Sequence, residues 1–153
     1  IRDHCVTGVQ TCALPILIGA ELEGRRLSRQ AWNITARVRE VDGLLQHQPA
    51  LRGWLREVHP ELSFQAMAGA PLDHAKKTAA GRQQRLELIA AAFGAHAFAD
   101  LRGGYRRGAV ADDDLLDAFA ALWSAERLAR GEALVLPAMP EWDDTGLAME
   151  IVC

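Results

Sequence analysis

The junction at His59-Pro60 constrains the fold more than any other feature of this sequence. A residue before proline is disfavoured in the α region, and residues 54–58 before it are short, largely apolar and end in a β-branched valine. Pro60 suits the first position of a helix, where its missing N–H costs nothing, and Glu61 complements the positive end of that helix. The sequence therefore predicts a strand over residues 54–58 that leads directly into a helix over residues 60–68.

The same junction is a candidate for chemistry. Glu57, His59 and Glu61 place two carboxylates and an imidazole at the C-terminal end of the predicted strand. In α/β sheets, ligands bind beyond the carboxyl ends of the strands. A well-formed strand-to-helix turn explains these residues equally well, so both interpretations stand at this point.

Hydrophobic periodicity and turn residues predict the remaining elements. Asp112 or Asp113 is the expected N-cap of the strongest helix, and Gly131 is its expected end. Strands are expected over residues 133–136 and 147–152, as a hairpin or as two edge strands around the turn-like residues 137–146. The other predicted helices cover residues 29–46, residues 79–93 and the short stretch 97–101. This alternation indicates the α/β class.

Two helices carry apolar faces that predict the core. The stripe on the first consists of Ala31, Ile34, Val38, Val41 and Leu45, and the face on the second consists of Leu86, Ile89, Ala90 and Phe93. The strongest helix is apolar on nearly every side, so we expect Asp117 within it to be neutral, paired or bound to a cation.

Composition excludes some classes of function. The 153 residues carry a net charge of −3, which gives no electrostatic basis for tight non-specific binding to nucleic acid. No apolar run is long enough to span a bilayer. Cys5, Cys12 and Cys153 have no zinc-site spacing, and a reducing, cytoplasmic compartment is the simpler expectation.

Two charged groups suit phosphate chemistry. Asp114 and Asp117 are spaced i,i+3 on one helix face, and hard cations such as Mg²⁺ favour a few carboxylate oxygens. Lys76, Lys77 and Arg82 form, together with Arg85, a basic cluster that could contact phosphate. Such a cluster is more often a solvated face.

Five motifs in one order resemble a bacterial and archaeal family of uncharacterised proteins, described as predicted nucleases with an RNase H-like fold. The likeness covers nearly all of residues 25–153. Its motifs lie at residues 27–34, 39–42, 57–64, 76–78 and 113–118, and the ending at residues 146–151 also matches. The pattern Asp114-x-x-Asp117-Ala118 further looks like the final catalytic helix of Holliday-junction resolvases of the RNase H superfamily.

The resemblance implies helices packed on a small mixed sheet and a site that uses Mg²⁺ or Mn²⁺. Glu57, Asp114 and Asp117 would be its catalytic residues and metal ligands, with Asp113 as the substitute if the register differs. His59 or Glu61 would position water or hold the turn. Lys76, Lys77 and Arg82 would contact phosphate.

The beginning of the chain departs from the family. Residues 6–16 resemble the translation of a sequencing adapter, and a weak signal peptide with Cys12 as a lipid-anchor cysteine fits them less well. We therefore expect residues 1–16 to be non-native and residues 17–153 to be the C-terminal part of a single RNase H-like domain. Its N-terminal strands, and two acidic ligands with them, would be missing from this partial fold.

Three functions remain open from the sequence. The first is a fragment of a metal-dependent nuclease, weak or inactive as it stands, that hydrolyses phosphodiesters of DNA or RNA with a metal-activated water. The second is a non-catalytic nucleic-acid-binding or regulatory domain that retains the fold. The third is an enzyme acting on small phosphorylated substrates, since fold does not fix function. The sequence does not predict an oligomeric state.

Overall fold

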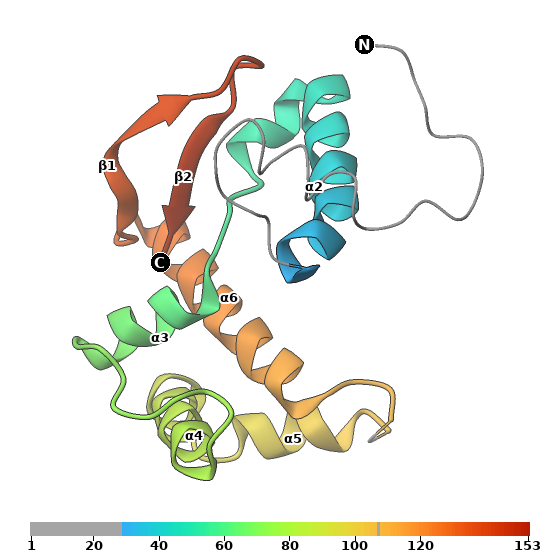
Figure 1. Ribbon diagram of the computed structural model, residues 1–153. Helices are drawn as coiled ribbons and strands as arrows, with labels where there is room; N and C mark the ends of the chain where they lie inside the picture. Colours follow the sequence, from blue (N-terminus) through green and yellow to red (C-terminus); the bar gives the residue numbers. More distant parts are fainter. Residues whose placement is uncertain (1–28, 107) are drawn as a thin grey trace. The chain divides into compact units, whose positions relative to one another are not determined.

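The computed structural model describes residues 29–106 and 108–153. The chain divides into two compact units, Ile1–Arg52 and Gly53–Cys153, and each is described here by itself (Figure 1). The adapter-like residues 6–16, the expected boundary after residue 16 and the connector up to residue 28 lie outside the described residues.

Helix α2 (Arg29–His47) is the main described element of the first unit, and the short 3₁₀ helix η1 (Pro49–Gly53) follows it. The helix predicted over residues 29–46 is therefore confirmed. Arg52 Nε donates to the carbonyl oxygen of Leu45 at 3.0 Å, which satisfies one carbonyl near the C-terminal end of α2.

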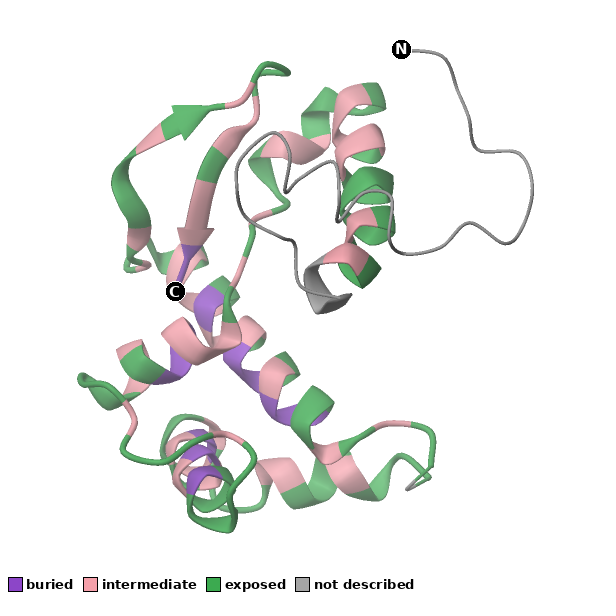
Figure 2. Ribbon diagram, in the orientation of Figure 1, coloured by how far each residue is buried: buried purple, intermediate pink, exposed green. Residues whose placement is uncertain are grey.

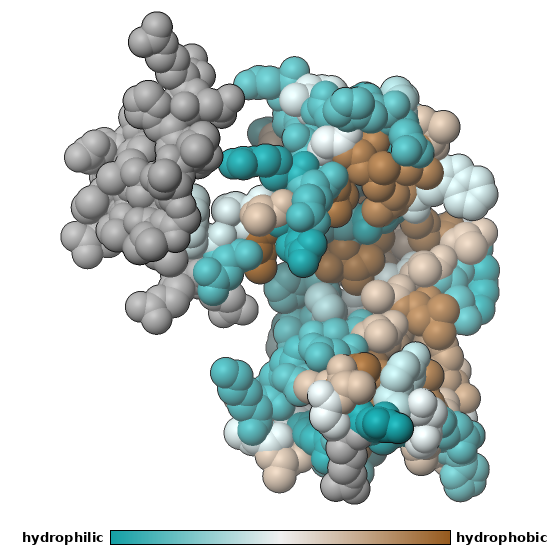
Figure 3. Space-filling model, turned by 90° about the vertical axis from the view of Figure 1, so that its right-hand side faces the viewer, coloured by the Kyte–Doolittle hydropathy of each residue, from teal (hydrophilic) through white to brown (hydrophobic). Residues whose placement is uncertain are grey.

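The apolar stripe of α2 is not buried as we expected. Ile34, Val38 and Val41 are 55%, 59% and 44% exposed, and the side chain of Ala31 lies outside the description. In residues 29–52, the described part of this unit, α2 and the short η1 supply no second layer for this face to pack on. Figure 3 shows hydrophobic side chains, in brown, at the surface of the face that it views.

The second unit begins with four helices: α3 (Pro60–Ala68), α4 (Ala79–Phe93), α5 (Ala97–Gly103) and α6 (Asp112–Arg130). All four were predicted, and Gly131 ends α6 at φ 71° as expected. The N-cap of α6 was predicted wrongly. Ala111 occupies that position without a side-chain bond, and the three aspartates lie in the first turn, where their charge favours the helix dipole.

The core of this unit is formed by helices. Buried residues occupy the facing sides of α3, α4 and α6 (Figure 2). Phe119 on α6 packs on Phe93 and Phe98, with ring centroids 5.3 and 6.4 Å apart. The buried cluster consists of Phe64, Ile89, Leu116, Phe119 and Ala120. The predicted buried face of α4 is confirmed, since Ile89 is fully buried and Leu86 and Phe93 pack against this cluster.

A hydroxyl pair joins α3 to α6 inside this core. Ser63 Oγ and Ser124 Oγ are 2.8 Å apart, and both side chains are fully buried. Buried hydroxyls require hydrogen-bond partners, and each of these two supplies the other. The small side chains also let the two helices approach closely at this point.

Strands β1 (Val135–Trp142) and β2 (Ala148–Val152) form an antiparallel pair. On the other edge of β2, Val58 forms a parallel bridge to Val152, and the Val152 amide donates to the Glu57 carbonyl at 2.9 Å. Arg56 and Glu150 form an ion pair of 3.3 Å two residues back along both segments, which fits the same parallel register. The strand predicted over residues 54–58 is thus reduced to one isolated bridge beside β2. The sheet of the described residues is two-stranded and antiparallel, whereas a mixed sheet was expected.

Strand β1 is longer than predicted. It continues through Pro137 and Pro140, which we expected in a turn, up to Trp142. Proline cannot donate to a sheet ladder and is tolerated on an edge strand or at a bulge. Both conditions hold, because β1 pairs only with β2 among the described residues and its register shifts between Leu136 and Glu141.

The architecture is a mixed α/β structure, as the sequence predicted. Most of the packing is helix on helix, and Val152 and Cys153 at the end of the sequence are also buried. Within the described ranges, no helix is both long and apolar enough to cross a membrane.

Candidate functional site

An ion pair brings two of the singled-out motifs together. Lys76, in the loop before α4, donates to both carboxylate oxygens of Asp117 on α6, at 2.7 and 2.6 Å. The two side chains are 30% and 32% exposed. Asp117 is therefore paired, one of the three states that we expected for a carboxylate on this helix. Its partner is a residue predicted to contact phosphate.

The loop that carries Lys76 is held firmly against the start of α4. Thr78 caps the helix, accepting from the Gly81 amide at 2.9 Å, and its hydroxyl donates to the Ala75 carbonyl at 2.8 Å. Gly81 is buried, and a Cβ at this position would lie 2.1 Å from the Ala75 carbonyl oxygen. Only glycine allows the loop to lie this close to the helix.

Arg85 ties the same loop to α3. Its guanidinium binds both carboxylate oxygens of Glu61 and donates to the carbonyls of Gly81, at 2.7 Å, and His74, at 3.4 Å. It also lies over the Phe64 ring, 5.6 Å from the centroid. Charge-assisted bidentate pairs of this kind are strong and directional.

Sequence reasoning missed the role of Arg85 by grouping it with a solvated basic face. The side chain is only 2% exposed. A signal was present, because Arg85 lies one turn before Ile89 on the apolar face of α4, so a buried position was foreseeable. Glu61, predicted to position water or hold the turn, serves in this structure as the partner of Arg85.

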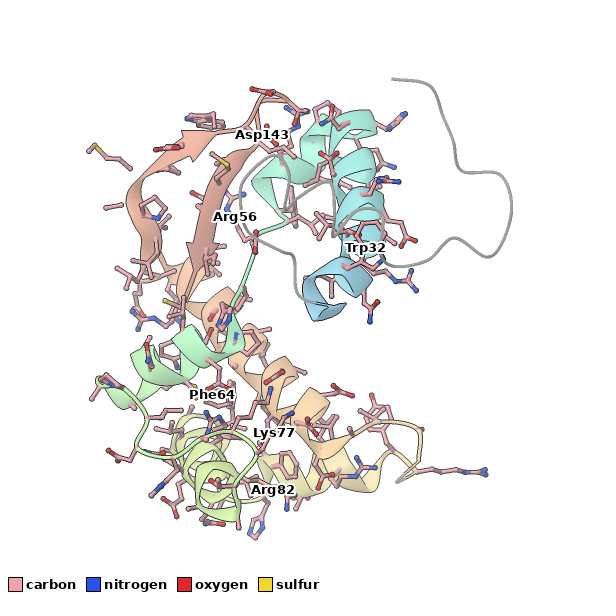
Figure 4. The ribbon with its side chains drawn as sticks, viewed as in Figure 1. Trp32, Arg56, Phe64, Lys77, Arg82 and Asp143 are labelled. Carbon is pink, nitrogen blue, oxygen red and sulfur yellow. The ribbon has the colours of Figure 1, made fainter. Side chains whose placement is uncertain are left out.

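The other predicted phosphate-contacting residues lie near this loop. Arg82 pairs with Asp112 at 2.5 Å, and Arg102 joins the same carboxylate at 3.3 Å. Lys77 is exposed and forms no ion pair with any residue that the structure describes. Figure 4 shows Lys77 and Arg82 beside the start of α4, in the lower part of the view.

Glu57 and His59 precede Glu61 at the N-terminal end of α3, next to the sheet. The described contacts of both are made by the backbone: the Glu57 carbonyl accepts from Val152, and the His59 carbonyl accepts from Leu62 and Ser63. His59 is the N-cap of α3 without a side-chain bond, and both side chains are exposed. The junction thus does form the predicted turn into α3.

The structure does not gather the three predicted metal ligands. In residues 29–106 and 108–153, no three His, Cys, Asp or Glu side chains come together as a metal site. Asp113 and Asp114 are exposed in the first turn of α6, and Asp117 follows one turn later. Glu57 is therefore separate from the two aspartates, and its assignment as a ligand stays a prediction.

Asp117 has a cationic partner in the structure, since both of its oxygens accept from the Lys76 ammonium. Mg²⁺ is commonly bound by one or two carboxylates together with waters and substrate phosphates. Asp114 and Asp117, three positions apart on α6, remain the residues predicted to hold such an ion.

Two titratable groups elsewhere have shifted pKa values. Hydrogen bonds to Asp143, first from the Leu147 amide and then from the Thr145 hydroxyl, hold the pKa of its carboxyl below the usual value. Burial raises the pKa of the Cys153 thiol, and the nearby positive charge of Arg127 opposes this shift. Neither group lies among the predicted site residues.

Comparison with known protein families identifies the family of this chain. Residues 15–142 match a family described as "Protein of unknown function (DUF429)". No curated protein and no solved structure matches the chain. The match spans most of the sequence, including α2 and every predicted site residue. The chain therefore belongs to the DUF429 family.

Proposed function

We propose that this protein hydrolyses phosphodiester bonds of nucleic acid with Mg²⁺ or Mn²⁺, and that its domain has an RNase H-like fold. The observation that carries the proposal is the Lys76–Asp117 pair, which joins a basic loop to an acidic helix across 41 positions of sequence. Phosphodiester cleavage needs both charges in one place: carboxylates for a cation and lysines for the phosphate.

Different residues of the chain would bind the cation, bind the phosphate and position the loop. Asp114 and Asp117 present hard oxygen donors from one face of α6, the type of ligand that Mg²⁺ and Mn²⁺ prefer. Lys76 and Lys77 hold the phosphate beside them as point charges. Arg85 and Glu61 keep the loop and its lysines in place. When bound, the metal ion supplies an activated water and neutralises charge on the phosphate.

A second candidate is a non-catalytic nucleic-acid-binding or regulatory domain. The separation of Glu57 from Asp114 and Asp117 favours it, since two carboxylates alone are a minimal metal site. The pairing of Arg82 with Asp112 favours the regulatory form of this candidate, because a paired guanidinium is less available to phosphate.

Metal-dependent cleavage is the direct test. The protein is incubated with end-labelled single- and double-stranded DNA and RNA in Mn²⁺, in Mg²⁺ and in a chelator, and products are resolved on denaturing gels. Asp117→Asn is compared with Asp144→Asn, the same chemical change at an exposed position in the β1–β2 turn. Thermal unfolding of each variant checks that it remains folded.

We expect cleavage that the chelator abolishes. Asp117→Asn should lower it at least as much as the loss of an outer-shell metal partner does, about 10- to 100-fold, and Asp144→Asn should leave it unchanged. Binding of an oligonucleotide without cleavage in either metal would favour the second candidate. Equal activity of the two variants would remove Asp117 from the mechanism.

A further inference from the structure

A shallow groove of about 290 Å³ lies between α3 and the start of the hairpin. Leu134, Leu136 and Cys153 line it on the hairpin side, and Leu62 and Pro71 are among the residues that line it on the side of α3. The lining is almost entirely apolar. A hollow of this kind can take an apolar side chain of a partner, and such anchors carry much of the binding energy at interfaces.

Backbone interactions fix both sides of the groove. Leu134 and Cys153 exchange two backbone hydrogen bonds, of 2.7 and 3.0 Å, which hold the start of β1 against the end of β2. On the other side, Gly69 ends α3 at φ 70°, a conformation that glycine adopts at little cost. The groove is therefore preformed, and a side chain can enter it without a rearrangement of the backbone.

The apolar surface continues from the groove onto one face of the hairpin. Leu136 lies opposite Ile151, and Glu141 lies opposite Met149. Opposite residues of an antiparallel pair share a face, as do residues two apart on a strand, so these four side chains lie on one face. Leu136 and Met149 are 37% and 49% exposed, and most of β1 is exposed (Figure 2). The apolar surface therefore runs from the groove to the carboxylate of Glu141.

The hairpin is acidic as well as apolar. Residues 131–153 contain five acidic residues and no lysine or arginine. Glu132 and Glu150 pair with arginines, at 3.9 and 3.3 Å. Glu141 and Asp144, nearer the turn, have no basic partner among the residues that the structure describes. A surface with this charge repels phosphate groups and attracts lysine and arginine side chains.

We propose that the groove and this hairpin face bind an extended peptide segment of a partner protein, with an apolar side chain in the groove and a lysine or arginine beside Glu141. The charge of the hairpin selects a basic segment over a nucleic acid. Pro137 and Pro140 cannot donate hydrogen bonds from the edge of β1, so the segment is recognised by side chains rather than by strand addition. This inference goes beyond the proposed function and does not depend on it.

The register gives the spacing that such a segment needs. Ile151 and Met149 are two positions apart on β2, which is about 7 Å along a strand. Their partners Leu136 and Glu141 are therefore separated by a similar distance, although four residues of β1 bulge between them. Alternate side chains of an extended peptide have the same spacing. The segment should consequently carry its apolar and basic residues at alternate positions.

The test is fluorescence anisotropy of the full chain with the labelled peptide Gly-Leu-Ser-Leu-Ser-Lys-Ser-Lys. In one comparison peptide glutamate replaces the lysines, and in the other serine replaces the leucines. Leu136→Gln is compared with Leu101→Gln on α5, because both leucines are 37% exposed. Glu141→Gln is compared with Glu87→Gln, which changes an exposed glutamate on α4. Thermal unfolding checks that every variant remains folded.

We expect the leucine–lysine peptide to bind about 10-fold more tightly than either comparison peptide. Leu136→Gln should weaken its binding about 3- to 10-fold, because part of the buried apolar area is lost. Glu141→Gln should weaken it about 2- to 5-fold at low ionic strength, and less in high salt. Both control variants should bind like the wild type. In nuclear magnetic resonance spectra of the wild type, the peptide should shift the amides of Ala66 and Leu136.

Several results would overturn the proposal. Equal binding by Leu136→Gln and Leu101→Gln would show that the peptide binds elsewhere, and equal binding of the glutamate peptide would show that charge does not select the partner. Failure of the leucine–lysine peptide to bind at millimolar concentration also contradicts it. An oligonucleotide that shifts the same amides would make the surface a nucleic-acid site. A dimer of the chain that Leu136→Gln dissociates would make it a contact between two copies.

Discussion

The helical cluster (α3–α6) and the hairpin (β1 and β2) of the second unit are packed very differently. In the cluster, Phe64 and Ile89 are completely buried, and the buried polar residues are hydrogen-bonded: Ser63 to Ser124, and Arg85 to Gly81 and Glu61. In the hairpin, Met139 and Trp142 are 86% and 67% exposed. The same stretch of chain therefore contains one region with its own core and one whose apolar side chains largely face solvent.

The difference shows where the site gets its rigidity. The Lys76–Asp117 pair and the Arg85 contacts all lie within the helical cluster. The hairpin contributes no residue to these contacts. Changes in the cluster should therefore affect stability and the site together, and changes in the hairpin should affect neither strongly.

The largest expected effect comes from emptying the core of the cluster. Phe64→Ala should lower the free energy of unfolding by about 3–5 kcal/mol, because it removes a fully buried ring and leaves a cavity. The matched change in the hairpin, Met139→Ala, should alter it by no more than about 0.5 kcal/mol. Urea denaturation followed by circular dichroism measures both. Similar losses in the two variants would mean that the hairpin carries a core of its own.

A smaller effect is expected at the point where the loop meets α4. Gly81→Ala places a Cβ against the Ala75 carbonyl, and overpacking of this kind costs about 1–3 kcal/mol. Gly103→Ala is the control, because nothing lies within 4 Å of the added Cβ. It should be neutral or stabilising by up to about 1 kcal/mol. Both values come from the same denaturation experiment.

Gly81→Ala also tests whether the loop positions Lys76. If it does, Lys76→Gln should cost less stability in the Gly81→Ala background than in the wild type, since the displaced loop no longer places the ammonium on Asp117. An equal cost of Lys76→Gln in the two backgrounds would show that the loop can move without moving Lys76.

Local signals in the sequence predicted the helices well, but they could not predict contacts between residues that are distant in sequence. Pro60 and Gly131 set helix ends through their own backbone chemistry, and the structure agrees within one or two residues. The Lys76–Asp117 pair depends on how α4 packs against α6, and no local pattern encodes that. The prediction that the apolar stripe of α2 is buried failed for the same reason. A period of apolar residues predicts that a helix has an apolar face, but not which element packs on that face.

The sequence predicted several residues of the candidate site, but it did not predict which of them contact each other. Asp117 was expected to be paired or bound to a cation, but its partner was unknown until the fold placed Lys76 beside it. Glu57 was joined to the aspartates through family resemblance, and the structure leaves it beside the sheet. Arg85 was overlooked because an arginine is rarely buried unless it is paired, and its pair with Glu61 spans 24 positions.

The smallest expected effect concerns the turn of the hairpin, which a single carboxylate holds. Asp143 Oδ1 accepts from the amides of Thr145 and Leu147, at 2.9 and 2.8 Å, and from the Thr145 hydroxyl. These bonds lower the pKa of Asp143 below its reference value of 3.8. The carboxylate therefore stabilises the turn at a pH above 3.8, and this contribution is lost as the pH falls through the lower pKa of the folded state.

Protonation of Asp143 at acid pH should consequently loosen the hairpin turn. It should leave the helical cluster unchanged. The amide proton shifts of Thr145 and Leu147, followed by nuclear magnetic resonance below pH 5, should titrate together with an apparent pKa below the reference value. Asp143→Asn keeps an oxygen acceptor but cannot titrate, so in this variant the two shifts should stay flat, whereas Asp144→Asn should titrate like the wild type. If the Ile89 amide in the core titrated with the same pKa, the turn and the cluster would be coupled. The contrast between a self-contained helical core and a locally held hairpin would then be wrong.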